Sequence, residues 1–472
     1  MRPKHIVLFI GVCLLLLGLI CYFFPQSQAP YGLHFPSLSE VLELHEDTLA
    51  TLDSPAPLDT LTSLDTSTLD TLNSLAPTEN VSTETTTIAA TSTATPKPQP
   101  QPATTKAPQA SSPVTPANDP LALFRAGLTE ASSRQVRVIH YGDSQIEEDR
   151  ISNNIRRHLQ ALYGGSGAGW IQVPQNVPSK TTKMTVTMND KLVTRKTGPV
   201  RYTVFGRQSD HRPHGNQYNA SGYVSIMDST LRKGSEQLFI HIDPLGEVTT
   251  ANCFSQIRVL KKGDIEVNGL DQDLLLYPDS TTQCDIELFG QGDLYGLSLE
   301  SSVGVLVDNV PMRGAIGNTF TKMDSAQMAD YYRQTNTRLI ILQFGGNVMP
   351  GTQSTNRIYG YVKNMRKQIA LLRQCAPNAS IMFVGPSDML TTIDGERTSY
   401  PYLSLLDNQL AKMAAEEGIG YFSLYQAMGG KGGMKQWQSS GLAAGDGVHF
   451  THKGANRAGE LLWEWIEKEL KK

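Results

Sequence analysis

Residues 135–144 read Gln-Val-Arg-Val-Ile-His-Tyr-Gly-Asp-Ser, a run of β-forming residues that ends in a glycine turn. The following residues, 146–162, place apolar side chains at helical spacing. A strand, a tight turn and a helix form the start of an α/β unit, and sites in such folds lie beyond the carboxyl ends of the strands. The sequence therefore predicts that Ser144 has an exposed hydroxyl at the edge of a sheet.

The same alternation returns in the last third of the chain. Strands are predicted at residues 303–310, 338–344, 380–384 and 419–424, and helices at 121–131, 357–373, 402–417 and 453–470. Strands that alternate with helices predict a parallel sheet covered on both faces. We therefore expect an α/β domain in two parts, residues 119–168 and 305–472.

The segment between these two parts has a different pattern. Short alternating runs at residues 183–187, 238–242, 257–260 and 284–289 are separated by Gly, Asn, Asp and Pro. Many short strands with few helical stretches indicate an all-β sandwich. We predict that residues 169–304 are such a sandwich, inserted into the α/β domain.

The N-terminal quarter does not have the composition of a folded domain. Residues 5–24 carry no formal charge and are long enough to span a bilayer, and Arg2 and Lys4 precede them. This pattern predicts a cytoplasmic tip and transmembrane anchor over residues 1–24, with a cleaved signal peptide as the alternative. Residues 25–118 are rich in Ser, Thr and Pro and are predicted to be a disordered linker.

Charge and cysteine content restrict the function further. The formal net charge of −4 gives no electrostatic reason to expect nucleic acid as a partner. No spacing of Cys and His indicates zinc, and we expect neither a metal nor a cofactor. Cys253 and Cys284 lie in the same β-rich segment, where a disulfide and a pair of buried thiols are both open alternatives.

Four short motifs carry groups that acyl transfer requires. Gly142-Asp143-Ser144 offers a hydroxyl, although a serine before a helix is usually only a cap. Asp446-Gly447-Val448-His449 offers a base with a carboxylate that can orient it. Gly345-Gly346-Asn347 and Arg313-Gly314-Ala315 offer N–H donors for a developing oxyanion.

Together and in this order, the four motifs resemble those of the SGNH, or GDSL-type, hydrolase family. The resemblance covers about residues 119–168 and 305–472 and implies a flavodoxin-like parallel sheet. It implies that Ser144 is the nucleophile, His449 the base and Asp446 the acid that orients it.

The same resemblance assigns an oxyanion hole to Ser144, Gly314 and Asn347, and makes Asp143 a structural partner of the turn. Two positions depart from the family pattern. Gln145-Ile146-Glu147-Glu148-Asp149 stands where the family usually continues with Leu or His, and Val348 stands where it often has Asp. We expect these departures to affect the substrate class more than the mechanism.

The long insertion between Ser144 and Gly314 is similar to that of periplasmic peptidoglycan O-acetylesterases, in which the insert resembles a carbohydrate-binding module. This implies a serine esterase that removes O-acetyl groups from a cell-envelope polysaccharide through an acetyl-Ser144 intermediate. Peptidoglycan is the first candidate for that polysaccharide. It further implies a catalytic domain in the periplasm, anchored to the inner membrane. An O-acetyltransferase, an esterase for another acetylated glycan and an inactive glycan-binding scaffold are the alternatives. Five aromatic residues of the insert can either line a sugar platform or pack in its core: Trp170, Tyr202, Phe205, Tyr218 and Tyr223.

Overall fold

The computed structural model describes residues 119–173, 175, 179–188, 191–192, 200–203, 206–209, 224–226 and 238–472. The anchor predicted over residues 1–24 and the linker predicted over residues 25–118 lie outside these described residues. In the described part of the chain, no helix combines the length and the apolar character needed to cross a bilayer.

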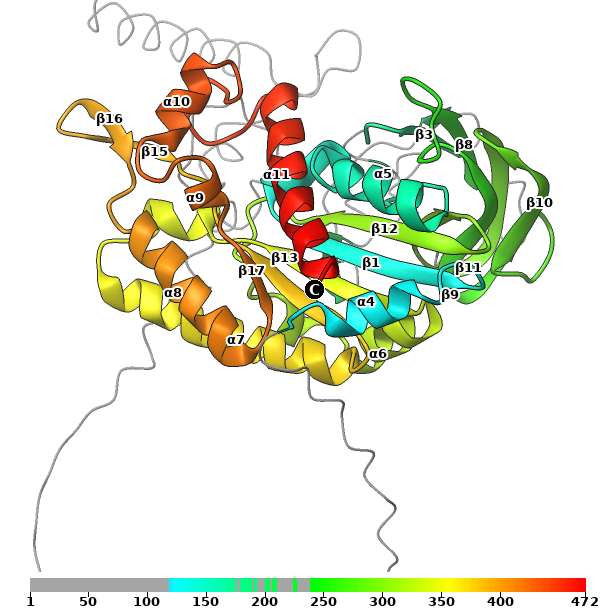
Figure 1. Cartoon of the computed structure of the whole chain (residues 1–472). Coiled ribbons are helices and arrows are strands. Elements are labelled where there is room, and N and C mark those ends of the chain that lie inside the picture. Colours follow the sequence, from blue (N-terminus) through cyan, green and yellow to red (C-terminus); the bar gives the residue numbers. More distant parts are fainter. Residues whose placement is uncertain are drawn as a thin grey trace, which may run out of the picture. The chain divides into compact units, whose positions relative to one another are not determined.

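A five-stranded parallel sheet forms the centre of the α/β part (Figure 1). Its strands are β1 (Gln135–Gly142), β12 (Gly304–Pro311), β13 (Thr337–Gln343), β14 (Ser380–Val384) and β17 (Gly420–Phe422). Their order in space is β12-β1-β13-β14-β17, so the second strand of this sheet along the chain lies at the edge beside the first. This is the strand order of flavodoxin-like folds, and the predicted α/β class with a parallel sheet is confirmed.

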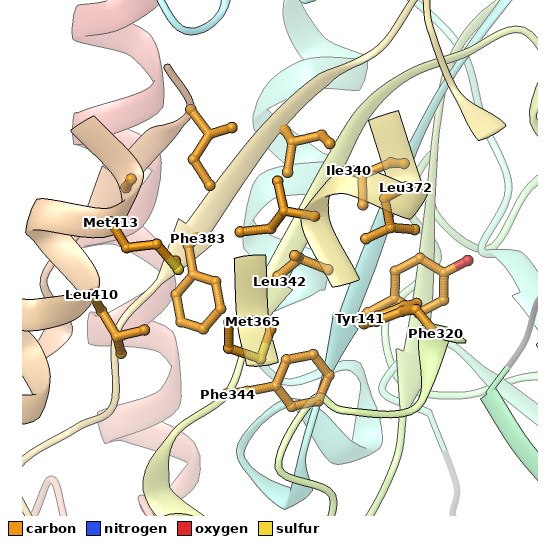
Figure 2. Packing of buried hydrophobic residues seen from close by; sticks show 14 of the residues in the cluster. Tyr141, Phe320, Ile340, Leu342, Phe344, Met365, Leu372, Phe383, Leu410 and Met413 are labelled. Carbon is orange, nitrogen blue, oxygen red and sulfur yellow. The ribbon is translucent and has the colours of Figure 1, made fainter. Parts of the chain in front are cut away.

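Three helices and the sheet enclose one hydrophobic core. They are α6 (Ser325–Gln334), α7 (Thr355–Cys375) and α8 (Leu403–Glu417). Ile340 and Phe383 of the sheet are fully buried against this layer. Figure 2 shows how Leu342 and Phe383 lie beside Met365 and Leu410 of the covering helices.

The opposite face of the sheet has its own core, because successive side chains of a strand point to opposite sides. Val138, Ile341 and Met382 each follow or precede a residue of the first core and are fully buried here. The helices of this layer are α4 (Ala122–Leu128), α5 (Ser152–Tyr163) and α11 (His452–Leu470). The prediction of helices on both faces is therefore confirmed.

Short elements connect the layers. They are η4 (Ser144–Asp149), η5 (Phe320–Lys322), η6 (Gly346–Gly351), β15 (Leu390–Ile393), β16 (Glu396–Ser399), α9 (Leu424–Ala427) and α10 (Gly433–Ser439). The hairpin of β15 and β16 and the helices α6 and α10 were not among the predicted elements. The hairpin matters for the site, because it follows β14 at the carboxyl edge of the sheet.

In its described residues, the chain between α5 and β12 is all β, as predicted, but its strands are not divided into two large sheets. The strands are β2 (Gly169–Ile171), β3 (Thr182–Met188), β4 (Lys191–Leu192), β5 (Val200–Thr203), β6 (Gly206–Ser209), β7 (Val224–Ile226), β8 (Leu238–Pro244), β9 (Phe254–Val267), β10 (Leu274–Thr281) and β11 (Cys284–Glu300). Among the described residues, eight of them form one antiparallel sheet, and β5 pairs only with β6.

The long strand β11 joins, in one sheet, strands that a sandwich would divide between two sheets. It pairs with β8 near its start, with β7 further on and with β2 near its end, while β9 follows its other edge. A bulge next to Gly296, whose φ is +143°, bends the strand. One bent sheet therefore encloses a single core (for example Ile240, Ile257 and Leu297), and alternation in the sequence cannot distinguish this from two sheets.

A buried ionic cluster joins this inserted β segment to the parallel sheet. Arg137 of β1 donates to Glu300 of β11 at 2.5 Å and to Asp308 of β12 at 2.7 Å, and all three side chains are fully buried. The backbone N–H of Trp170 also donates to Asp308, at 2.8 Å. Burial opposes ionisation of Glu300, but Arg137 and Arg258 hold its pKa at about 2.

Two further sequence questions are answered within the described residues. Cys253 and Cys284 are free thiols, so the disulfide alternative is wrong. Trp170 is buried in a core and donates its ring N–H to the carbonyl of Tyr295 at 3.1 Å, so it forms no exposed platform. The side chains of the other four aromatic residues considered for a platform lie outside the described part.

Candidate active site

The turn after β1 carries Ser144 and is not the regular helix that was predicted from residue 146. We call residues 143–149 the nucleophile turn. Its 3-10 segment is broken at Glu147, whose ψ is 158°, and Glu148 follows with a φ of +60°. Asp143 caps the turn by accepting a hydrogen bond from the N–H of Gln145 at 3.0 Å. The regular helix begins only at Ser152.

Buried charges hold this turn in an unusual conformation. Glu148 and Asp149 both have a φ of +60°, a region that residues other than glycine adopt rarely and at an energetic cost. The buried carboxylate of Asp149 forms a bidentate ion pair with Arg156, which is also buried. Arg156 in turn donates to the carbonyl of Val307 in β12 at 2.6 Å. A tertiary ion pair, and not local helix propensity, sets the path of the chain here.

Ser144, His449 and Asp446 come together across the carboxyl edge of the sheet. The Oγ of Ser144 lies 2.9 Å from Nε2 of His449, and Nδ1 of the same ring lies 2.7 Å from Oδ2 of Asp446. This is the arrangement in which a histidine can accept the serine proton while a carboxylate holds its tautomer. More than 300 residues separate Ser144 from His449 in the chain, so the fold alone makes this contact.

Asp446 is kept as a carboxylate by its neighbours. Its burial favours the neutral acid, but hydrogen bonds from the N–H of Val448, from the His449 ring and from the N–H of His449 outweigh this effect and lower its pKa. The two backbone N–H groups lie 2.9 and 3.0 Å from Oδ1. A charged Asp446 is the form that can orient and stabilise a protonated imidazole.

Residues 445–449, which we call the base loop, are held from outside by groups that the sequence analysis did not identify. Arg397 of the β15–β16 hairpin donates to the carbonyls of Gly445 at 3.0 Å and Asp446 at 2.7 Å. The side-chain amide of Gln145 donates to the carbonyl of Val448 at 2.7 Å. No local pattern marks Arg397, because its partners lie 48 and 49 residues away.

The candidate oxyanion donors differ in their availability. Both amide hydrogens of Asn347 have acceptors within the protein, Oδ2 of Asp143 at 3.2 Å and the carbonyl of Ala315 at 3.1 Å. The backbone N–H groups of Ser144 and Gly314 donate to no group in the described part of the chain. An oxyanion would therefore meet two unoccupied backbone donors and one side chain that must share its hydrogens.

Asp143 links the nucleophile turn to Asn347 from a buried position. Burial raises its pKa to about 6, while the hydrogen bond from the N–H of Gln145 and the nearby His449 act in the opposite direction. Both of its oxygens accept hydrogen bonds, one from Gln145 and one from Asn347. Among the described residues, no hydrogen bond joins Asp143 to the His449 ring. This agrees with the expectation that Asp143 is a structural partner of the turn.

A small pocket opens beside the serine, with an empty volume of about 360 Å³. Its lining comes from the carboxyl ends of β1, β13 and β14 and from the base loop: Asp143, Ser144, Gln145, Gln343, Phe344, Gly346, Asn347, Gly385, Pro386, Ser387, Met389 and Val448. Gly314 is not part of this lining. The strand order reverses between β1 and β13, which is where open α/β sheets bind ligands. In the described residues, no three His, Cys, Asp or Glu side chains are placed to hold a metal ion.

Comparison with known families agrees with this geometry. Residues 279–457 match the model of the GDSL-like lipase/acylhydrolase family. The chain therefore carries a GDSL-type hydrolase domain, and the resemblance inferred from the four motifs is confirmed. The matched range includes Gly314, Asn347, Asp446 and His449 but not Ser144, which the parallel sheet brings to the same edge. No curated protein matches the chain.

Solved structures show a similar fold. A peptidoglycan O-acetylesterase aligns with 75% of this chain and 97% of its own, with a TM-score of 0.57 and 20% identity. The acetyl xylan esterase AlAXEase covers 34% of this chain and 81% of its own, with a TM-score of 0.28 and 14% identity. The periplasmic domain of a lipopolysaccharide acetyltransferase from Salmonella ser. Paratyphi A covers 35% of this chain and 74% of its own, with a TM-score of 0.24 and 13% identity. The last two scores are too low to bear on function.

Proposed function

We propose that the protein is a serine esterase that removes O-acetyl groups from a cell-envelope polysaccharide, with peptidoglycan as its substrate. The observation that carries this proposal is the continuous contact from Asp446 through His449 to Ser144, at 2.7 and 2.9 Å, beside a small pocket. A nucleophile, a base and an orienting carboxylate in this geometry are what acyl transfer requires.

The reaction proceeds in two halves. The Oγ of Ser144 attacks the acetyl carbonyl as Nε2 of His449 takes its proton, and the sugar hydroxyl leaves with that proton. Water, deprotonated by the same nitrogen, then attacks acetyl-Ser144 and releases acetate. In both halves the negative oxygen is stabilised by the N–H groups of Ser144 and Gly314 and by the Asn347 amide. Asp446 holds the ring in the tautomer that leaves Nε2 free to accept the proton.

The pocket and the fold support acetyl as the acyl group and a glycan as its carrier. The pocket beside Ser144 is small, and a short acyl group fits it better than a long one. The likeness to the peptidoglycan O-acetylesterase extends over nearly the whole of that chain, and so includes more than the hydrolase core. These two observations favour peptidoglycan over an arbitrary ester.

We further propose that the inserted β segment binds glycan, and that residues 1–24 anchor the protein in the inner membrane. The linker of residues 25–118 would then let the catalytic domain reach an immobile polymer in the periplasm. Protease treatment of spheroplasts is expected to degrade the catalytic domain while the protein stays with the membrane fraction. A domain protected from the protease would contradict this location.

The test of the activity is acetate release from O-acetylated peptidoglycan by a fragment starting at residue 119. Matched de-O-acetylated peptidoglycan and the Ser144→Ala variant are the controls. We expect acetate only from the acetylated polymer and only with Ser144 present. Acetyl that appears on an added oligosaccharide instead of as free acetate would indicate a transferase. Binding to the polymer without any acetate release would indicate an inactive scaffold.

A further inference from the structure

An ion pair joins two segments that the proposed mechanism uses separately. Nε and Nη2 of Arg313 donate to Oε1 and Oε2 of Glu147, each at 2.7 Å. Glu147 belongs to the nucleophile turn, and Arg313 belongs to the loop after β12. We propose that this pair positions the N–H of Gly314 in the oxyanion hole, an inference that rests on the esterase function proposed above.

The covalent geometry explains how the pair acts on Gly314. The N–H of Gly314 belongs to the peptide unit shared with Arg313, and that unit is planar. On the other side, the carbonyl of Ala315 accepts from Asn347 at 3.1 Å. Gly314 itself has a φ of +74°, and apart from its chain neighbours no heavy atom of the described residues lies within 4 Å of the position that a Cβ would take there. Gly314 is held through its two neighbours, Arg313 by the ion pair and Ala315 by hydrogen bonds with Asn347 and, at 3.0 Å, with the carbonyl of Met312.

The state of Asn347 makes the position of Gly314 more important. Because both amide hydrogens of Asn347 already have acceptors, the candidate donors that have no acceptor among the described residues are the N–H groups of Ser144 and Gly314. Such donors act best about 2.7 to 3.1 Å from the developing oxyanion, and a misplacement near 1 Å can cost about a hundredfold in rate. Glu147 and Arg313 connect the two segments that carry these two donors.

The burial of the pair predicts where its effect will appear. The Arg313 side chain is 66% exposed, so solvent reaches the guanidinium and screens part of its attraction to Glu147. The Glu147 side chain is only 8% exposed, and the two parallel hydrogen bonds allow a single orientation of the guanidinium. We therefore expect that removal of the Glu147 charge causes a loss of catalytic geometry without a comparable loss of stability.

The experiment compares Arg313→Met, Glu147→Gln and the double variant with p-nitrophenyl acetate as the substrate. Each single change is expected to lower kcat about tenfold with KM within about twofold, because a donor is lost only in the transition state. The double variant should also lose about tenfold and not a hundredfold, since both changes break one contact. Arg313→Lys keeps the charge but not the paired geometry and should recover only part of the loss.

Arg333→Met is the matched control, because Arg333 forms an exposed ion pair with Asp330 on α6. We expect this variant to keep the wild-type kcat, and Glu147→Gln and the double variant to unfold within about 2 °C of the wild type, whereas Arg313→Met leaves the buried Glu147 carboxylate unpaired and should unfold at a lower temperature. The proposal is overturned if both single variants keep kcat within about twofold, if their losses multiply, or if only KM rises. If Arg313→Met does not fold, Glu147→Gln provides the same test. Absence of hydrolysis by the wild type would instead reject the esterase function itself.

Discussion

The nucleophile turn and the base loop meet at one hydrogen bond but are held in different ways. The nucleophile turn contains two residues with a φ of +60° and depends on the buried ion pair of Asp149 with Arg156. The base loop is partly exposed, and its carbonyls accept hydrogen bonds from the exposed side chain of Arg397 and from Gln145. Ser144 is therefore held by a strained backbone whose conformation lowers the free energy of unfolding. His449 is held by exposed hydrogen bonds that change the free energy of unfolding little.

The largest expected effect would show that the two regions act as one unit. Ser144→Ala and His449→Ala should each lower kcat for p-nitrophenyl acetate by about 10⁴-fold or more, since neither group works without the other. The double variant should be no slower than either single variant. Losses that multiply in the double variant would contradict the shared proton transfer inferred from the 2.9 Å contact.

The next effect concerns the support of the nucleophile turn. Arg156→Met leaves the buried carboxylate of Asp149 without its partner and should lower the free energy of unfolding by about 3 to 5 kcal/mol. Urea denaturation measures this change. Arg157→Met, at the exposed neighbouring position of the same helix, is the control. A difference between the two variants below about 1 kcal/mol would show that the strained turn does not depend on the ion pair.

Asp143, which lies beside the triad, and Asp446, which belongs to it, should give the stability opposite dependences on pH. The pKa of Asp143 is raised from its usual 3.8 to about 6 by burial, a difference worth about 3 kcal/mol. Between about pH 4 and about pH 6, Asp143 is ionised in the unfolded chain but still protonated in the folded protein. Its contribution to stability therefore falls as the pH rises over this range and is constant above about pH 6. Asp143→Asn should remove this fall.

Asp446 provides the comparison, because its pKa is lowered and not raised. Its contribution is present above the pKa of the unfolded chain and is lost as the pH falls through the lower pKa of the folded state. Urea denaturation of the wild type, Asp143→Asn and Asp446→Asn between about pH 2 and about pH 7.5 measures both trends, the Asp143 trend above about pH 4 and the Asp446 trend below it. Parallel curves for the wild type and Asp143→Asn would show that Asp143 does not titrate differently on folding.

The smallest expected effect is on the base loop. Arg397→Ala should lower kcat about tenfold, because Gly445 and Asp446 lose their external donors, while the free energy of unfolding changes by less than about 1 kcal/mol. Arg373→Ala is the control, since Arg373 is a surface arginine that donates to a backbone carbonyl, that of Glu417, on α8. If Arg397→Ala lowers stability and leaves kcat unchanged, the hairpin has only a structural role.

Sequence reasoning was most successful where local pattern and buried environment agree. The run of apolar residues in β13 and the run in β14 can form only central strands, and both were predicted within a residue of their bounds. The hairpin also had a signal that went unused, because Asp394-Gly395 separates two β-forming runs. Their φ values of +51° and +84° are those that such a turn requires.

Other features could not be predicted, because contacts distant in the chain decide them. The helix predicted from residue 146 fails at its start because Asp149 is drawn to Arg156 and Glu147 to Arg313. The alternation of the inserted strands shows which face is buried but not that β11 continues through the whole sheet. The motif order predicted that Ser144, Asp446 and His449 act together, but it could not show that Asn347 donates its two amide hydrogens to Asp143 and Ala315.

The fully buried guanidinium of Arg137 restricts how this architecture can change. One of its two carboxylates, Asp308, belongs to the parallel sheet, and the other, Glu300, belongs to the inserted β segment. A lineage that lost the insertion, or exchanged it for another module, would leave part of that charge without a partner unless Arg137 changed in the same step. The insertion is therefore no exchangeable cassette, because the first strand of the hydrolase sheet carries a buried charge that has one of its partners in the insertion.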